Sequence, residues 1–187
     1  MEADWEVEIG SGAPIIDAHW SGFLNLQEHP DLAARLPEAA QLPALADALI
    51  QLNAPLSPVL TTKCDLWCVD PSENALDPIE IGAPPDASQA EYAVAQACYI
   101  DILSRPPLQW SQIKEVENLC KAICAGLRAV SLRSTRADFI VRRAILDDEQ
   151  ECLGITAYLV ACAASDTAAL RLLAQALAAL SGSILAA

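Results

Sequence analysis

Five arginines fall within sixteen residues of the C-terminal half, and their chemistry suits ligand binding: Arg128, Arg133, Arg136, Arg142 and Arg143. A guanidinium group is always charged, and its planar fork of donors matches carboxylate and phosphate groups. We therefore predict that the last four of these arginines bind a small anionic ligand. Consecutive strand residues point to opposite faces. One of Arg142 and Arg143 should therefore face the site, while the other pairs with a carboxylate.

The alternative is that these arginines only form ion pairs. Residues 1–100 carry two basic and sixteen acidic side chains, a balance of 2 − 16 = −14, whereas residues 101–187 carry nine of each. Acidic partners are therefore abundant, and pairing at the surface is the usual role of such arginines. An anionic ligand would also approach against the field of a chain whose formal net charge is −14.

Asp17 and His19 are a second group that could do chemistry. On a strand they would face the same side, where a carboxylate can orient an imidazole as a general base. A surface ion pair is the commoner role of such residues. The chain has one further histidine, His29, and no Gly-x-Ser-x-Gly or phosphate-loop motif. A small-molecule enzyme that uses Asp17, His19 and the arginines is therefore the alternative function, and no catalytic residue is assigned.

The seven cysteines include two pairs spaced four residues apart, Cys64 with Cys68 and Cys120 with Cys124. Four thiolates could bind zinc, but four residues of strand span about 13 Å, which separates the first pair. The second pair lies in a helical apolar stripe, where cysteine acts as a small hydrophobic residue. We predict reduced core thiols, no metal and no cofactor. A thiol redox or metal protein is the weakest alternative.

Composition sets the class of protein. The 187 residues suit a single domain over 1–187, and a hydrophobic content of 53% provides its core. The negative charge disfavours nucleic acid and anionic membranes. No uninterrupted stretch reaches the roughly 18 apolar residues of a membrane span. The acidic N-terminus does not resemble a secretory leader, and an odd number of cysteines suits a reducing compartment. We therefore expect a cytoplasmic protein that binds neither nucleic acid nor membranes.

Periodicity predicts the elements of the first half. Polar and apolar residues alternate over residues 4–9, which predicts a strand that pairs with residues 15–20 in a hairpin. Helical periodicity begins after Pro30, is interrupted at Pro37 and resumes at Pro43. Two further segments follow. Residues 58–69 predict a strand with Leu60, Cys64, Leu66 and Cys68 on one face, and the proline-rich acidic residues 70–86 predict a long loop.

The second half begins with a capping-box pattern, which predicts a helix over residues 88–105. A clean apolar stripe predicts another helix over residues 111–130. Residues 139–146 and 152–163 flank an acidic turn and predict a hairpin, whose second strand is apolar on both faces and therefore central. A final helix over residues 166–180 is predicted to be capped by Asp166.

This order of elements predicts an α+β domain, with an antiparallel or mixed sheet and helices packed mainly on one face. Residues 167–180 have polar side chains only at Thr167, Arg171 and Gln175. Such a helix must be covered on more than one face, and a second copy of the chain would supply the cover. We therefore predict a non-enzymatic binding or interaction module that self-associates as a homodimer through its C-terminal helix.

Overall fold

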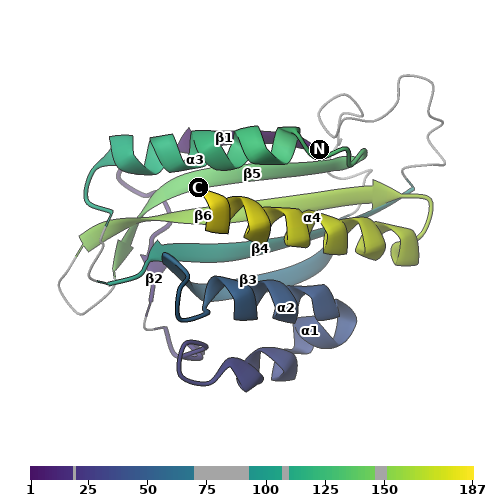
Figure 1. Cartoon of the computed structure of the whole chain (residues 1–187), viewed down its shortest axis with the longest axis horizontal. Coiled ribbons are helices and arrows are strands. Elements are labelled where there is room, and N and C mark those ends of the chain that lie inside the picture. Colours follow the sequence, from purple (N-terminus) through teal and green to yellow (C-terminus); the bar gives the residue numbers. More distant parts are fainter. Residues whose placement is uncertain (19, 70–92, 107–109, 146–150) are drawn as a thin grey trace.

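A computed structural model describes residues 1–18, 20–69, 93–106, 110–145 and 151–187. The described chain forms a six-stranded mixed sheet with helices on one side (Figure 1). The order across the sheet is β1 (Glu2–Val7), β5 (Thr135–Ile145), β6 (Glu151–Ala163), β4 (Val94–Ser104) and β3 (Val59–Val69), while β2 (Ile16–Asp17) also pairs with β5. β1 and β2 run parallel to β5, and the other neighbours are antiparallel. The predicted α+β class is confirmed.

The helices begin where the sequence predicts. The 3-10 helix η1 (Pro30–Arg35), α1 (Pro37–Gln41) and α2 (Pro43–Leu52) each start at a proline, which lacks only an N–H that the first turn leaves unpaired. α3 (Ile113–Arg128) buries the middle of the predicted apolar stripe, while Ile113 at its start stays exposed. α4 (Asp166–Ala186) crosses the middle of the sheet between α2 and α3 (Figure 1). Its N-cap is Ser165, whose hydroxyl accepts from Ala168 N–H at 3.4 Å, so the predicted Asp166 cap is displaced by one residue.

Burial alternates along β5 and thereby distinguishes the two faces of the sheet. Ala137, Phe139 and Val141 are fully buried in the core, beneath the helices. Arg136 and Asp138, which alternate with these residues along the strand, are only half-buried. The helices therefore cover one face, and the polar side chains of β5 define an open face.

The predicted hairpin between residues 139–146 and 152–163 is confirmed by the antiparallel pairing of β5 with β6. β6 is also central, with β5 on one side and β4 on the other. Residues 146–150, which contain most of the predicted acidic turn, lie outside the described residues.

The helix predicted over residues 88–105 is wrong where the structure describes it, because residues 94–104 form β4. Tyr99 and Ile102 happen to share a helical spacing, but Cys98, Ile100 and Ile102 alternate into the core. Pairing with β3 and β6 satisfies the backbone on both edges of this strand, which overrides the local pattern. The capping box at residues 88–91 and the loop predicted over residues 70–86 lie outside the described residues.

The predicted N-terminal hairpin is also wrong, because β1 and β2 both pair with β5 rather than with each other. The two segments bury side chains against different parts of the domain. Ala3 of β1 lies in the core beneath the helices, whereas Ile16 packs with Leu60 and Leu103 in a separate cluster. Because β1 and β2 both pair with β5, Ala3 can reach the core while Ile16 reaches the separate cluster.

A register shift between Thr61 and Lys63 interrupts β3. An extra residue reverses the facing of every later side chain. Leu60 therefore joins the cluster around Ile16, while Cys64 and Leu66 pack on the core beneath the helices. The prediction that Leu60 shares a face with Cys64 and Leu66 is wrong for this reason.

α4 is covered mainly by its own chain, since it packs on β6, β4, α2 and α3. Among the described helices it is the one that by length and composition could cross a membrane, a test that the core helix of a folded domain also passes. Between the two ends of α4 the strip that stays exposed is narrow and consists of Arg171, Gln175, Ala178, Gly182 and Leu185. Self-association through α4 would have to use this strip.

Candidate binding site

Two cavities of about 470 and 330 Å³ hollow the open face of the sheet. They adjoin, because Asp138 of β5 and Tyr158 of β6 line both. The first extends toward β1, where Glu6 lines it, and the second extends toward β3, where Trp67 lines it. The two hollows therefore cross the strands on the side of the sheet that no described helix covers.

The hollow beside β1 is acidic. Asp4, Glu6 and Asp138 supply three carboxylates and Arg136 one guanidinium, a local balance of 1 − 3 = −2. Arg136 donates from Nε and Nη2 to the Asp138 carboxylate at 2.7–2.9 Å, so its charge is already engaged. Asp4 is 3.9 Å from Arg128, but both side chains are mostly exposed, and such pairs are weak. The field of this hollow favours a cation.

The hollow beside β3 is aromatic and apolar, and is lined by Trp67, Ala97, Tyr158 and Val160 among others. Trp67 and Tyr158 belong to a row of rings that Tyr99 joins, with centroids 6.1 Å apart between Trp67 and Tyr99 and 5.7 Å apart between Tyr99 and Tyr158. Trp67 remains 37% exposed. Tryptophan, tyrosine and arginine are the residue types that carry most binding energy in protein interfaces.

Arg142 lies on the open face and links Glu8 to the Tyr158 ring. Its Nη2 donates to Glu8 Oε2 at 3.0 Å, and its guanidinium lies 5.8 Å from the centre of the Tyr158 ring. The Arg142 side chain is only 12% exposed. Arg142 therefore acts as a structural partner, and its position shows that the Tyr158 ring accepts a cation against its face.

Asp101 of β4 is a buried carboxyl on the same face, only 8% exposed. Thr156 donates its hydroxyl to Asp101 Oδ1 at 2.6 Å. Burial raises the pKa of Asp101, while the Thr156 hydrogen bond and the charges of Arg142 and Lys63 oppose the rise. Asp101, Thr156 and Arg142 thus form a polar network beneath the binding surface.

Burial is also the main cause that raises the pKa of Tyr99, to about 12, and the charge of Asp101 adds to it. The Tyr99 ring therefore carries a neutral phenol at physiological pH.

The four arginines predicted to bind an anion do not converge. Arg136 and Arg142 share the open face of β5, but each is held by a carboxylate. Arg143 points to the opposite face by the alternation of the strand, and Arg133 lies exposed before β5 begins. Pairing with carboxylates, the alternative given by the sequence, describes the geometry of Arg128, Arg136 and Arg142. Binding of an anion by this set stays a prediction.

Asp17 is exposed at the end of β2, where it pairs with Ile145. His19 lies outside the described residues. The enzyme alternative that uses the two residues therefore stays a prediction.

Sequence reasoning missed the aromatic row. Trp67, Tyr99 and Tyr158 come from three strands, and their contact depends on the register of β3, β4 and β6, which no local pattern encodes. The alternation of Arg136, Asp138 and Arg142 along residues 136–142 was the one available signal that these side chains share a face.

All seven cysteines are unpaired thiols. Burial raises the pKa of Cys120 to about 12, and the nearby thiol of Cys124 and the charge of Glu117 add to it. Within the described ranges, no three histidine, cysteine or acidic side chains gather closely enough to hold a metal ion.

We expect titration of the denatured protein with a disulfide reagent, without reductant, to find close to seven thiols. In the native protein Cys68 should react first, because it is exposed, whereas Cys64 is half-buried and the other five are buried. Elemental analysis showing stoichiometric zinc or iron would contradict the prediction of unliganded thiols.

Comparison of the chain with models of known protein families, with curated proteins and with solved structures found no match.

Proposed function

We propose that this protein is a non-enzymatic binding module whose open sheet face holds a basic segment of a partner protein. The observation that carries the proposal is the acidic hollow around Asp138 that adjoins the aromatic hollow around Trp67. A ligand that satisfies both must combine a positive charge with apolar surface.

Charge favours a basic partner both during its approach to the protein and at the site itself. Over the whole chain the net charge of −14 attracts cations and steers their approach. At the site Asp138 is tied to Arg136, while the Glu6 carboxylate has no hydrogen-bond or ion-pair partner within the described chain and remains available to a ligand. A lysine head group could bind there while its aliphatic stem lies on the Tyr158 ring.

The size of the hollows favours a polypeptide segment. Each exceeds the volume of a single side chain, and an extended segment presents residues i and i+2 on one side, about 7 Å apart. We infer that a basic side chain enters the acidic hollow and an aliphatic side chain enters the hollow beside Trp67. These contacts are made by side chains, so the proposal does not require hydrogen bonds from the segment's backbone.

The test uses a fluorescent peptide in which lysine and leucine alternate with glycine, here called the lysine–leucine peptide. We expect Asp138→Asn to weaken its binding, measured by anisotropy, by about tenfold, because one carboxylate is lost and Arg136 is released. The matched control is Asp47→Asn, which makes the same charge change on the exposed face of α2 and should leave the affinity unchanged.

An equal loss in both variants would mean only non-specific attraction and would reject the site. Stronger binding of a peptide with glutamate in place of lysine would also reject it, and would favour the anionic ligand predicted from the arginines.

The homodimer is proposed to form along the exposed strip of α4. Leu185 is 43% exposed there, and the small residues Ala178 and Gly182 would allow a second helix to approach closely. We expect light scattering coupled to size exclusion to give a dimer mass for the native chain and a monomer mass for Leu185→Glu. Ile50→Glu, at a similarly exposed position on α2, should remain dimeric. A native monomer at micromolar concentration would contradict the proposal.

A further inference from the structure

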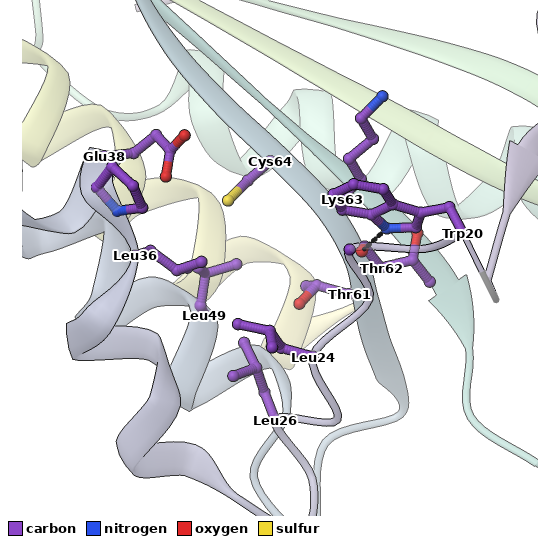
Figure 2. Close-up of a pocket in the computed structure, with 12 residues that line it drawn as sticks. Trp20, Leu24, Leu26, Leu36, Glu38, Leu49, Thr61, Thr62, Lys63 and Cys64 are labelled. Carbon is purple, nitrogen blue, oxygen red and sulfur yellow. Dashed lines mark hydrogen bonds between the residues drawn. The ribbon is translucent and has the colours of Figure 1, made fainter.

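A separate cavity of about 200 Å³ lies at the edge of the sheet, where β3 meets α1, α2 and the segment that leads into η1 (Figure 2). It shares no lining residue with the two hollows of the open face. Its body is apolar, and Figure 2 shows the leucines converging from different segments. These are Leu24, Leu26, Leu36 and Leu49.

The rim beside β3 is held by Trp20. Its Nε1 donates to the backbone carbonyl of Thr62 at 3.0 Å, and Lys63 Nζ lies 5.4 Å from the centre of the ring. A Cβ at Gly22 would come within 2.2 Å of the indole, so that only glycine permits this position of Trp20. Lys63 directs its ammonium away from the cavity (Figure 2). The rim is therefore formed by a fixed ring rather than by a charged group.

The opposite end of the cavity is polar. Figure 2 shows the Glu38 carboxylate and the Cys64 sulfur directed toward one another across this end. Glu38 is half-buried, and its carboxylate has no hydrogen-bond or ion-pair partner in the part of the chain that the structure describes. Burial raises the pKa of Cys64 to about 12, and the negative charge of Glu38 contributes, so that the thiol stays protonated at neutral pH.

We propose that this cavity binds a small amphiphilic amine, with its apolar body among the leucines and its ammonium group at Glu38. The charge of the available carboxylate selects a cation, and the leucines select an apolar body. An apolar cavity of about 150 Å³ holds benzene, so this one suits a body of about six to eight non-hydrogen atoms. The site is independent of the open sheet face.

Three unbranched six-carbon probes that differ in their head group test this assignment: n-hexylamine, n-hexanol and n-hexanoate. Affinities are measured by calorimetry, and protection of Cys64 from maleimide is followed by peptide mass mapping in a Cys68→Ser background. We expect hexylamine to bind most tightly and to slow alkylation of Cys64, which lines the cavity. Hexanoate should do neither.

Two matched variants test the role of Glu38. Glu38→Gln should weaken hexylamine by about tenfold while leaving hexanol unchanged, because only the charge interaction is lost. Asp31→Asn, which removes an exposed carboxylate of η1 outside the cavity, and Asp138→Asn, on the open sheet face, should leave hexylamine binding unchanged. Equal weakening by Glu38→Gln and Asp31→Asn, equal affinity for hexanoate, or hexylamine binding without protection of Cys64 would each overturn the proposal.

Discussion

Replacement of Phe139 by alanine is expected to lower the free energy of unfolding by about 3–5 kcal/mol. Phe139 is among the largest fully buried side chains and lies on β5 beneath the helices. Its removal costs the transfer free energy of the ring and leaves a cavity that close-packed neighbours fill only in part. Denaturant unfolding measured by circular dichroism provides the value.

The matched control is Ile140→Ala, one residue further along the same strand. Ile140 points to the open face and is only half-buried, so we expect a loss of about 1 kcal/mol or less. The ratio of the two losses in unfolding free energy tests directly whether the core lies on one face of the sheet. Similar losses would mean that something in the folded protein covers the open face as completely as the helices cover the other.

Replacement of Arg142 by leucine is expected to lower stability at pH 7 by about 1–3 kcal/mol, because Glu8 loses its partner and the buried Asp101 loses a nearby cation. Asp101→Asn should do the opposite and raise stability at pH 7, since the amide oxygen can still accept from Thr156. The double variant should be more stable than the sum of the two single effects, because Asp101→Asn gains more once the cation of Arg142 is gone. If the double variant shows only the sum of the two single effects, Arg142 and Asp101 are not coupled.

The sign of the pH dependence follows from the raised pKa of Asp101. Its ordinary value is 3.8, and burial raises it in the folded protein. Below 3.8 the carboxyl is neutral in both states and costs nothing, whereas above its folded pKa the buried charge destabilises the fold. The gain from Asp101→Asn should therefore be largest at neutral pH and shrink toward pH 4, as measured by unfolding at both pH values. A gain independent of pH would assign it to packing instead.

Local signals were sufficient wherever one element contains its own pattern. Prolines at positions 30, 37 and 43 mark three helix starts, and the stripe from Ile113 to Leu127 marks α3. The β5–β6 hairpin was also predictable, because its strands are close in sequence. These features were sufficient to predict the fold class, with helices mainly on one face of a sheet, without any knowledge of distant contacts.

The errors arise where distant contacts decide the structure. β4 is buried on most of both faces, so it lacks the alternation of polar and apolar residues that marks a half-exposed strand. Its apolar residues happen to recur at a helical spacing, and a helix was predicted for that reason. β1 and β2 share β5 as their partner, which lies more than one hundred residues away in the chain. Both candidate sites depend on such contacts. Tyr99 contacts Tyr158, and Glu38 lies close to Cys64. In each pair the two residues are distant in sequence and come together only in the folded chain.

The most direct test of the open-face proposal is a ¹H–¹⁵N correlation titration of the labelled protein with the lysine–leucine peptide. We expect the largest shift changes at the amides of Glu6, Asp138, Tyr158 and Val160, which line the two adjoining hollows, and little change along α2. The changes should diminish in Asp138→Asn. Perturbations confined to α4 or to the residues around Trp20, or saturating binding that leaves these four amides unmoved, would contradict the account.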